Sequence, residues 1–354
     1  MSSSRAQVRA AVRRRRRALL RSLPTPVVRR ARFLKWAVLG APPAKKSKAK
    51  TTKAKSTQLP AVGEGPTDLP KGRTQLDMRR QILGVLGDLS EASILEIGPG
   101  FAPIFAKREG YRTKVVDHTD RAGLENKYES HGYSSAEFEE VDFVLLAGGK
   151  MADEVGEQFD LVIASHVIEH STSIIDFVNE GGKLLRPGGR LAFVVPDKRF
   201  CFDRFRERSS LGAVIDASLQ PADRHSLGTL TDQSVNAVVR GKGISWSPSR
   251  SGSFRKVHDL DHARVAMRTA AAGDEYVDVH HWVFTPHHLR LLFADLADLG
   301  YISLHETMFH ETVGAEFYIV MSADGVGPGL SRAELVARAD AELAVPGPLK
   351  FAAD

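Results

Sequence analysis

Cysteine is almost missing from this chain of 354 residues, which contains only Cys201. A single cysteine cannot form an intrachain disulfide or a cluster of thiolate metal ligands, and it favours a reducing compartment. Long apolar runs are missing as well, since none approaches the ~20 residues that span a bilayer. We therefore expect a cytoplasmic protein, with peripheral association with a membrane surface as the alternative.

Acidic residues are missing from the first part of the chain. Residues 1–55 contain 18 Lys and Arg but no Asp or Glu, and the first acid is Glu64. The remaining chain has 49 − 18 = 31 basic residues against 43 acidic ones, a net charge of −12. The overall charge of +6 thus arises from a basic tail on an acidic body, so it gives no reason to expect that the body binds nucleic acid.

The tail has the composition of a disordered extension. An unbroken basic run covers 13–17, a Lys/Ala/Ser/Thr-rich run covers 45–55, and Pro and Gly are frequent from 60 to 70. We expect residues 1–70 to be tail and linker. The functional alternative is electrostatic attachment to an anionic membrane surface or to nucleic acid, with the apolar residues of 33–39 as a short anchor.

Strand and helix patterns alternate after residue 70. The patterns predict strands at 93–97, 113–117, 138–141, 159–164 and 190–195, and helices at 75–89, 103–109, 120–131 and 172–185. Such alternation indicates a parallel sheet with helices on both faces, joined by right-handed crossovers.

The C-terminal part is predicted to complete this sheet. Thr285 and Pro286 are typical of a helix N-cap and first helical position, and the helix ends at Gly300. Strands at 301–308 and 316–321 follow, joined closely enough to be antiparallel. We therefore assign 71–196 to the first half of the sheet and 285–325 to its last helix and hairpin. The remaining residues, 326–354, are expected to be a peripheral helix (331–343) and tail.

Residues 197–284 separate the fifth strand from the last major helix. This segment is far longer than the usual ~2–6-residue connection, and it lies at the carboxyl edge of the sheet, where ligands bind. We interpret it as an inserted substrate-binding cap, with 241–256 as a mobile loop.

A glycine loop, Gly98-Pro99-Gly100, directly follows the first strand. Glycines there let the backbone approach a ligand closely. Pro103 replaces the third glycine of a dinucleotide fingerprint. Glu96, two residues before the loop, would repel a diphosphate but suits a ligand with an ammonium and a sulfonium group. The loop therefore favours S-adenosylmethionine (SAM) over a dinucleotide.

Two further acids stand at predicted strand ends. Asp117 closes the second strand 19 residues after Gly98, where an acid can accept hydrogen bonds from ribose hydroxyls. Asp142 follows the third predicted strand and is a candidate for the adenine amino group.

Three segments carry a family resemblance: Leu95-Glu96-Ile97-Gly98-Pro99-Gly100, the stretch from Phe159 to His170, and Leu185-Arg186-Pro187-Gly188-Gly189-Arg190-Leu191. Over roughly 76–200 the chain resembles class I SAM-dependent methyltransferases of the methyltransferase type 11 group. The resemblance implies an α/β, Rossmann-like, seven-stranded sheet that is mostly parallel, with an antiparallel last strand. It also implies cofactor-binding roles for Glu96, Gly98 and Gly100 (methionine part), Asp117 (ribose), Asp142 (adenine) and Ser165 with His166 (cofactor lining).

His166, Glu169 and His170 follow the fourth strand and are the catalytic candidates, because a hydroxyl acceptor needs a general base and histidine suits that task. Similar positions in small-RNA 3′-terminal 2′-O-methyltransferases and ubiquinone-pathway O-methyltransferases carry Glu-x-x-Glu-His, and some bind Mg²⁺. His166 replaces the first Glu here, which would favour a transition metal. A divalent metal held by these three residues and His281, or His280 in its place, is thus a second interpretation.

The cap offers further polar candidates for binding an acceptor. They are Asp197, Arg199 and Asp203, then Asp259, Asp261 and His262, and finally His280, His281 and Trp282. Similar methyltransferases with Pro-Asp-Lys-Arg and His-His-Trp-x-Phe-Thr-Pro segments occur beside bacterial polysaccharide-synthesis enzymes. We therefore expect SAM-dependent O-methylation of a glycan or a small metabolite. The alternatives are a nucleic-acid methyltransferase tethered by the basic tail and a non-catalytic SAM-binding module.

Overall fold

A computed structural model describes residues 65–129, 133–146, 148–273, 276–344 and 350–351. The expected disordered tail and its attachment to membranes or nucleic acid fall almost wholly outside these residues. One correction applies to the end of the expected linker: the backbone N–H of Thr67 donates to the carbonyl of Thr312 at 2.8 Å. This part of the linker is therefore fixed to the edge of the fold. None of the described helices has the length and apolarity needed to cross a membrane.

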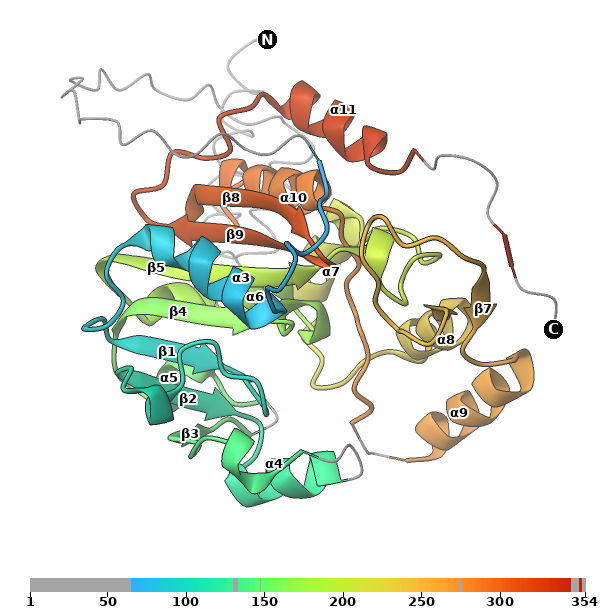
Figure 1. The fold of residues 1–354 in the computed structure, drawn as a ribbon, viewed down its shortest axis with the longest axis horizontal. Coiled ribbons are helices and arrows are strands. Elements are labelled where there is room, and N and C mark those ends of the chain that lie inside the picture. The colour runs from blue at the N-terminus through green and yellow to red at the C-terminus, as the bar shows by residue number, and fades with distance from the viewer. Residues whose placement is uncertain (1–64, 130–132, 147, 274–275, 345–349, 352–354) are drawn as a thin grey trace, which may run out of the picture. The chain divides into compact units, whose positions relative to one another are not determined.

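One seven-stranded sheet organises the described residues, with the strand order β3-β2-β1-β4-β5-β9-β8 (Figure 1). The strands β1 to β5 are parallel to one another, and β9 is antiparallel to both β5 and β8. This is the mostly parallel sheet with an antiparallel last strand that we expected. Its strands are β1 (Ile94–Ile97), β2 (Thr113–Asp117), β3 (Phe143–Val144), β4 (Phe159–Ser165), β5 (Leu185–Pro196), β8 (His305–Val313) and β9 (Glu316–Ser322).

The sheet is buried on both faces, as its central strands show. On β5, Leu191, Phe193 and Val195 pack into one core cluster, whereas Ala192 and Val194 pack into a second. This alternation follows from the two-residue period of a strand. Helix α3 (Gln75–Leu83) covers the second face, and four helices supply the first cluster: α5 (Met151–Val155), α6 (Ile174–Lys183), α7 (Leu211–Leu219) and α10 (Pro286–Asp298).

Helix α10 begins where the sequence predicted. Thr285 is its N-cap in an extended conformation, Pro286 is its first residue, and Gly300 follows its end with a φ of +76°. Two helices lie farther from the sheet centre: α4 (Arg121–Tyr128), after β2, and α11 (Arg332–Ala341), near the C-terminus. The contacts between α10 and α11 include an ion pair of Arg332 with Asp295 at 2.8 Å.

Three sequence predictions about elements are wrong. The third strand is Phe143–Val144 rather than 138–141. The expected helix at 103–109 is only a 3-10 turn, Lys107–Glu109, and the amides of Ile104 and Phe105 ahead of it donate to the side chain of Glu96. The end of the expected mobile loop, Phe254–Lys256, is a strand (β7) paired with β6 (Val238–Arg240).

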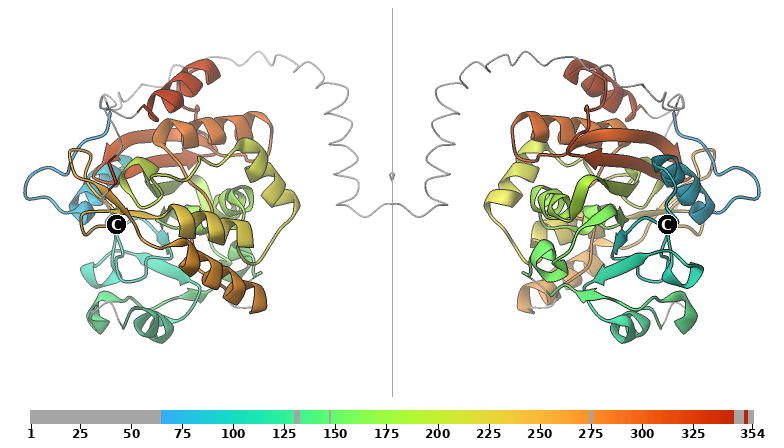
Figure 2. Two further views of the ribbon diagram at one scale, coloured as in Figure 1. Left: turned by 90° about the vertical axis from the view of Figure 1, so that its right-hand side faces the viewer. Right: turned by 90° about the vertical axis from the view of Figure 1, so that its left-hand side faces the viewer.

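The segment 197–284 contains this two-stranded ribbon, α7, α8 (Leu227–Asn236) and α9 (Leu260–Ala272). Figure 2 shows α8 and α9 close together, at the edge of the sheet where the carboxyl ends of β4 and β5 lie. Backbone bonds attach the segment's end to the sheet, since the N–H groups of His281 and Trp282 both donate to the carbonyl of Glu169, at 2.7 and 3.0 Å. The inserted segment therefore reaches the carboxyl edge of the strands.

Candidate active site

The glycine loop begins directly after β1. Gly98 and Gly100 have φ values of +58° and +53°, a conformation that glycine adopts with little cost. A Cβ at Gly98 would lie 3.1 Å from a methyl carbon of Val167. The loop therefore lies close against the segment that follows β4. Both positions favour glycine for their conformation, and Gly98 also for space.

Glu96 is fully buried beneath this loop. Its carboxylate accepts hydrogen bonds from the backbone N–H groups of Ile104 at 2.7 Å and Phe105 at 3.5 Å. Burial raises the pKa of Glu96 to about 7 despite these bonds. The structure thus shows Glu96 holding the loop in shape, and its contact with a ligand's ammonium group stays a prediction.

The raised pKa of Glu96 predicts a specific pH dependence of stability. The folded state holds the proton of Glu96 more tightly than the unfolded state, whose carboxyl has a pKa of 4.5. The resulting stabilisation is complete below pH 4.5 and is lost as the pH rises through about 7. The difference corresponds to about 3 kcal/mol at ~1.4 kcal/mol for each unit of pH. We expect the unfolding free energy of the wild type to fall by that amount relative to Glu96→Gln between about pH 4 and about pH 8. Urea denaturation would measure it, and parallel pH curves for the two proteins would contradict it.

Two of the three remaining cofactor candidates, Asp117 and Ser165, end strands, and Asp142 does not. Asp117 ends β2 and accepts a hydrogen bond from the backbone N–H of His118 at 2.7 Å. Ser165 ends β4, and its buried hydroxyl has no partner among the described residues. The prediction that Asp142 follows the third strand is wrong, because β3 starts one residue later. Its carboxylate accepts from Lys107 and from the backbone N–H of Val115, so its adenine role has no support from its position.

His166 directly follows β4 and is the one residue other than glycine with a positive φ, +55°, in the described part of the chain. Its Nε2 lies 2.8 Å from an oxygen of Glu316, the first residue of β9. Arg79 of α3 binds the same carboxylate with two nitrogens, at 2.9 and 2.7 Å, and Tyr318 donates to it at 2.7 Å. Burial alone would raise the pKa of Glu316, but Arg79 and His166 hold it well below its usual range.

Glu169 lies at the centre of three histidines. Its carboxylate is fully buried, and neither oxygen has a hydrogen-bond partner among the described residues. His166 Nδ1 is 3.7 Å and His280 Nε2 is 3.9 Å from the same oxygen. His170 offers a third ring, which packs edge-on against His280 with 4.7 Å between centroids. The structure therefore brings the three predicted catalytic residues, His166, Glu169 and His170, together with His280 of the cap. These four residues are called the histidine cluster below.

The outer sides of His170 and His280 face carboxylates. His170 Nδ1 lies 2.7 Å from Asp278, which also pairs with Lys127 of α4 at 3.4 Å. His280 Nδ1 contacts Asp203, which pairs with the buried Arg206 at 2.8 Å. Burial would raise the pKa of each aspartate, yet the neighbouring cations hold both values below their usual range. Both aspartates are therefore charged partners that orient the histidines.

Three cap residues that we expected to bind an acceptor have structural partners instead. Asp197 is fully buried and forms an ion pair with Arg199. Trp282 belongs to the core, and its indole N–H donates to the carbonyl of Ser171 at 2.6 Å. The expectation that these side chains bind an acceptor has no support from their positions, because the fold already uses them. Asp259 caps α9 through the N–H of His262.

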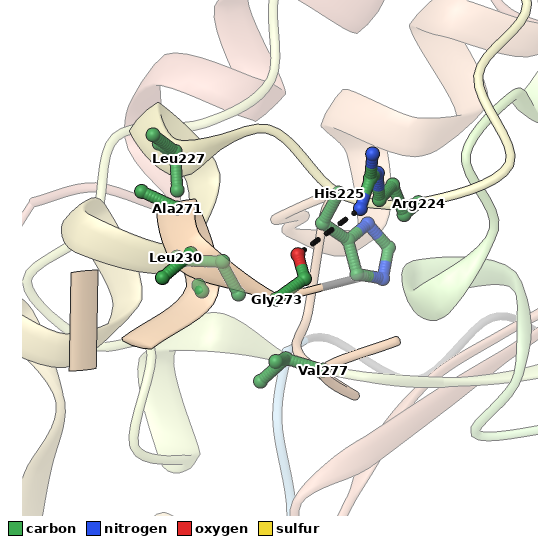
Figure 3. A pocket seen from close by; sticks show the side chains of 9 residues that line it. Arg224, His225, Leu227, Leu230, Ala271, Gly273 and Val277 are labelled. Atoms are coloured by element: carbon green, nitrogen blue, oxygen red, sulfur yellow. Dashed lines mark hydrogen bonds between the residues drawn. The ribbon is translucent and has the colours of Figure 1, made fainter. Parts of the chain in front are cut away.

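His281, the alternative metal ligand, faces His225 rather than Glu169, with 3.1 Å between their Nδ1 atoms. His225 in turn lines a cavity of about 290 Å³ between α8 and α9 (Figure 3). Its wall combines apolar side chains with two polar ones, Arg224 and His225. The other lining residues are Leu227, Leu230, Ala270, Ala271, Ala272, Gly273 and Val277.

Sequence reasoning missed three site residues: Arg79, Asp278 and Glu316. None lies in a recognisable motif, and each reaches the site only through the fold. Glu316 carried the one usable signal, since the first residue of an antiparallel strand lies at the carboxyl edge of its parallel neighbour. The register confirms this position, because Glu316 is opposite Pro196 at the end of β5.

Comparisons with known proteins agree with this arrangement. Residues 72–296 match the profile of a methyltransferase domain family, which is more than half of the chain. No curated protein is similar enough to count as a match. The CcbJ methyltransferase of Streptomyces caelestis shares 13% identity over 72% of this chain and 98% of that chain, with a TM-score of 0.38. The magnesium protoporphyrin IX methyltransferase of Synechocystis PCC 6803, with bound S-adenosylhomocysteine, shares 11% identity over 70% and 80%, with a TM-score of 0.33.

The glycopeptide N-methyltransferase MtfA, complexed with sinefungin, shares 10% identity over 73% of this chain and 99% of that chain, with a TM-score of 0.33. These likenesses are too weak to say anything about the acceptor. The family match, by contrast, spans the glycine loop, the histidine cluster and helix α10. The chain belongs to this methyltransferase domain family and is a SAM-dependent class I methyltransferase.

Proposed function

We propose that this enzyme transfers the methyl group of SAM to a hydroxyl oxygen of a small metabolite or a glycan, with His166 as the general base. The observation that carries the proposal is the position of His166 between Glu316 and the glycine loop. In the register of β1 with β4, Ile97 is opposite Ala164. His166 therefore follows β4 at the level where the glycine loop follows β1, which supports a position beside the proposed cofactor site.

The hydrogen bonding of His166 suits a base. Glu316 occupies Nε2 at 2.8 Å, which leaves Nδ1 as the nitrogen that can take a proton, and the buried carboxylate would stabilise the imidazolium that forms. In the reaction, the acceptor oxygen attacks the methyl carbon, the carbon–sulfur bond breaks, and the hydroxyl proton passes to Nδ1. S-adenosylhomocysteine and a methyl ether are the products. The positive φ of His166 is a strained conformation of the kind that clusters at functional sites.

The cap cavity supports a small acceptor. Its volume of about 290 Å³ is near the lower end of small-molecule pockets, ~300–1,000 Å³. His225, which lines this cavity, contacts His281, the neighbour of His280 in the chain. Burial, followed by the nearby His281, lowers the pKa of His225 to about 4, so the imidazole of His225 is uncharged at neutral pH.

A methyl-transfer assay with labelled SAM would test the proposed function. The full-length enzyme would be given panels of sugars, hydroxylated metabolites, nucleotides and RNA. We expect turnover with a sugar or a metabolite, and a product methylated on oxygen. Turnover with RNA alone would contradict the proposal, as would binding of SAM without turnover on any acceptor.

Gly98→Ala is expected to weaken SAM binding about tenfold or more. The new methyl carbon would lie 3.1 Å from a methyl carbon of Val167, on a residue with a left-handed backbone conformation. A tenfold loss corresponds to ~1.4 kcal/mol of strain. Gly110→Ala is the matched control, because Gly110 has a φ of +93° and open space around it. Calorimetric titration with SAM would measure both variants, and equal affinities would contradict the role of Gly98.

A further inference from the structure

Glu169 poses an electrostatic problem in the structure as it stands. A fully buried carboxylate normally accepts several hydrogen bonds or pairs with a cation, because burying an uncompensated charge is costly. Neither oxygen of Glu169 has a hydrogen bond among the described residues, and ring nitrogens of His166 and His280 lie 3.7 and 3.9 Å from one of them. No Lys or Arg forms an ion pair with it in the described part of the chain. A cation between Glu169 and the histidines would compensate this buried carboxylate.

The surrounding atoms are suitable ligands. One carboxylate oxygen of Glu169 and one ring nitrogen each from His170 and His280 all lie within 4.8 Å of one another. Metal bonds of ~2.0–2.2 Å place the ligands of one ion about 3–4 Å apart, so binding requires only a small contraction of the cluster. The set of two imidazoles and one carboxylate binds zinc and other first-row metals, whereas Mg²⁺ prefers oxygen ligands.

The second ring nitrogen of His280 adds an independent observation. Ligating histidines commonly donate their other N–H to a carboxylate, which fixes the ring and its tautomer. His280 shows this arrangement, with Nδ1 on Asp203 and Nε2 toward Glu169. His170 has Asp278 at 2.7 Å from its Nδ1. His280 thus has the carboxylate partner that supports a metal-bound imidazole.

We propose that Glu169, His170 and His280 bind one divalent transition-metal ion of the Zn²⁺ class. Three protein ligands leave at least one coordination position for water or for an acceptor oxygen. The site lies beside His166, whose Nδ1 is 3.7 Å from Glu169, so the ion would sit next to the proposed base. Metal binding itself depends on neither the acceptor nor the proposed base.

A second group of residues, His287, Glu311 and Glu342, has similar spacing but different chemistry. There, Glu342 already accepts hydrogen bonds from the backbone N–H of His287 at 2.9 Å and faces its Nδ1 at 2.7 Å. This carboxylate is satisfied without an ion. The comparison favours the Glu169 cluster and supplies a control position.

The test is calorimetric titration of the full-length protein, freed of metal by a chelator, with Zn²⁺ and separately with Mg²⁺. We expect one Zn²⁺ to bind per chain, and no comparable binding of Mg²⁺. Neither SAM nor an acceptor is present, so a failure here would leave the proposed methyl transfer standing. Conversely, a failure of methyl transfer would leave the metal site standing.

Variants assign the binding to these side chains. Glu169→Gln is expected to weaken Zn²⁺ binding at least ~100-fold, and Asp203→Asn ~10–100-fold, whereas His287→Ala keeps the wild-type affinity. Metal-free Glu169→Gln is expected to melt at or above the wild-type temperature, because the substitution removes an unpaired buried charge, and Zn²⁺ is expected to stabilise only the wild type. Absence of Zn²⁺ binding to the wild type would overturn the proposal. Wild-type affinity in Glu169→Gln, or its loss in His287→Ala, would also overturn it.

Discussion

His166→Asn is expected to lower kcat by about 10²–10⁴-fold, the usual contribution of a positioned general base. Asparagine keeps a polar side chain but cannot take up the proton of the acceptor. It also tolerates positive φ better than most residues, so the backbone at +55° should be retained. Single-turnover methyl transfer and SAM titration together would measure the effect, and the SAM Kd should change only a few-fold.

Glu316→Gln provides the matched test of how His166 is oriented. Glutamine preserves the size of the side chain but removes the charge that faces Nε2 at 2.8 Å. We expect kcat to fall while SAM affinity is kept, and Glu316→Asp to recover part of the activity. Wild-type kcat in His166→Asn would contradict the role of His166. An equal loss of SAM binding in both variants would indicate a structural role only.

Arg79→Met is expected to destabilise the fold by ~3–5 kcal/mol, because it leaves the buried carboxylate of Glu316 without its main cation. The side chain of Glu316 is only 3% exposed, and Arg79 binds both of its oxygens. Removing both charges, in Arg79→Met with Glu316→Gln, should recover much of the loss. Urea denaturation of the single and double variants would measure these differences.

Arg112→Met is the control for the loss of an arginine. Its pair with Glu91 is exposed, at 66% and 75% for the two side chains, and exposed pairs contribute ~0–1 kcal/mol. A loss in Arg79→Met as small as that in Arg112→Met would contradict the account of the Glu316 network. The lowered pKa of Glu316 adds a pH prediction: its stabilisation is present above the unfolded-state value near 4.5 and is lost as the pH falls toward the folded-state pKa.

Local pattern was enough to predict the central strands. β2 has the predicted bounds, and β1 and β4 differ from prediction by one residue at one end. Buried parallel strands are continuous apolar runs flanked by glycine or acids, which is a strong signal in a single sequence. The edge strand β3 has two half-buried residues, too few to give such a pattern.

Some residues of the site could also be predicted from the sequence, and others could not. His166, Glu169 and His170 could be found because they follow a strong strand directly. Their partners could not, since Arg79, Asp278 and Glu316 are at least 87 residues away along the chain from His166. Each reaches the site only through the topology of the fold. Trp282 looked available for binding because sequence gives residue type but not burial, and its 2% exposure places it in the core.

The position of the transferred methyl group tests the proposed function most directly. The enzyme would be incubated with SAM carrying an isotope-labelled methyl group and the acceptor that supports turnover, and the product would be examined by nuclear magnetic resonance. The account predicts a methyl ether, with the label on oxygen, which forms in the wild type and is strongly reduced in His166→Asn. A label on nitrogen or carbon, or equal amounts of product from the two proteins, would contradict it.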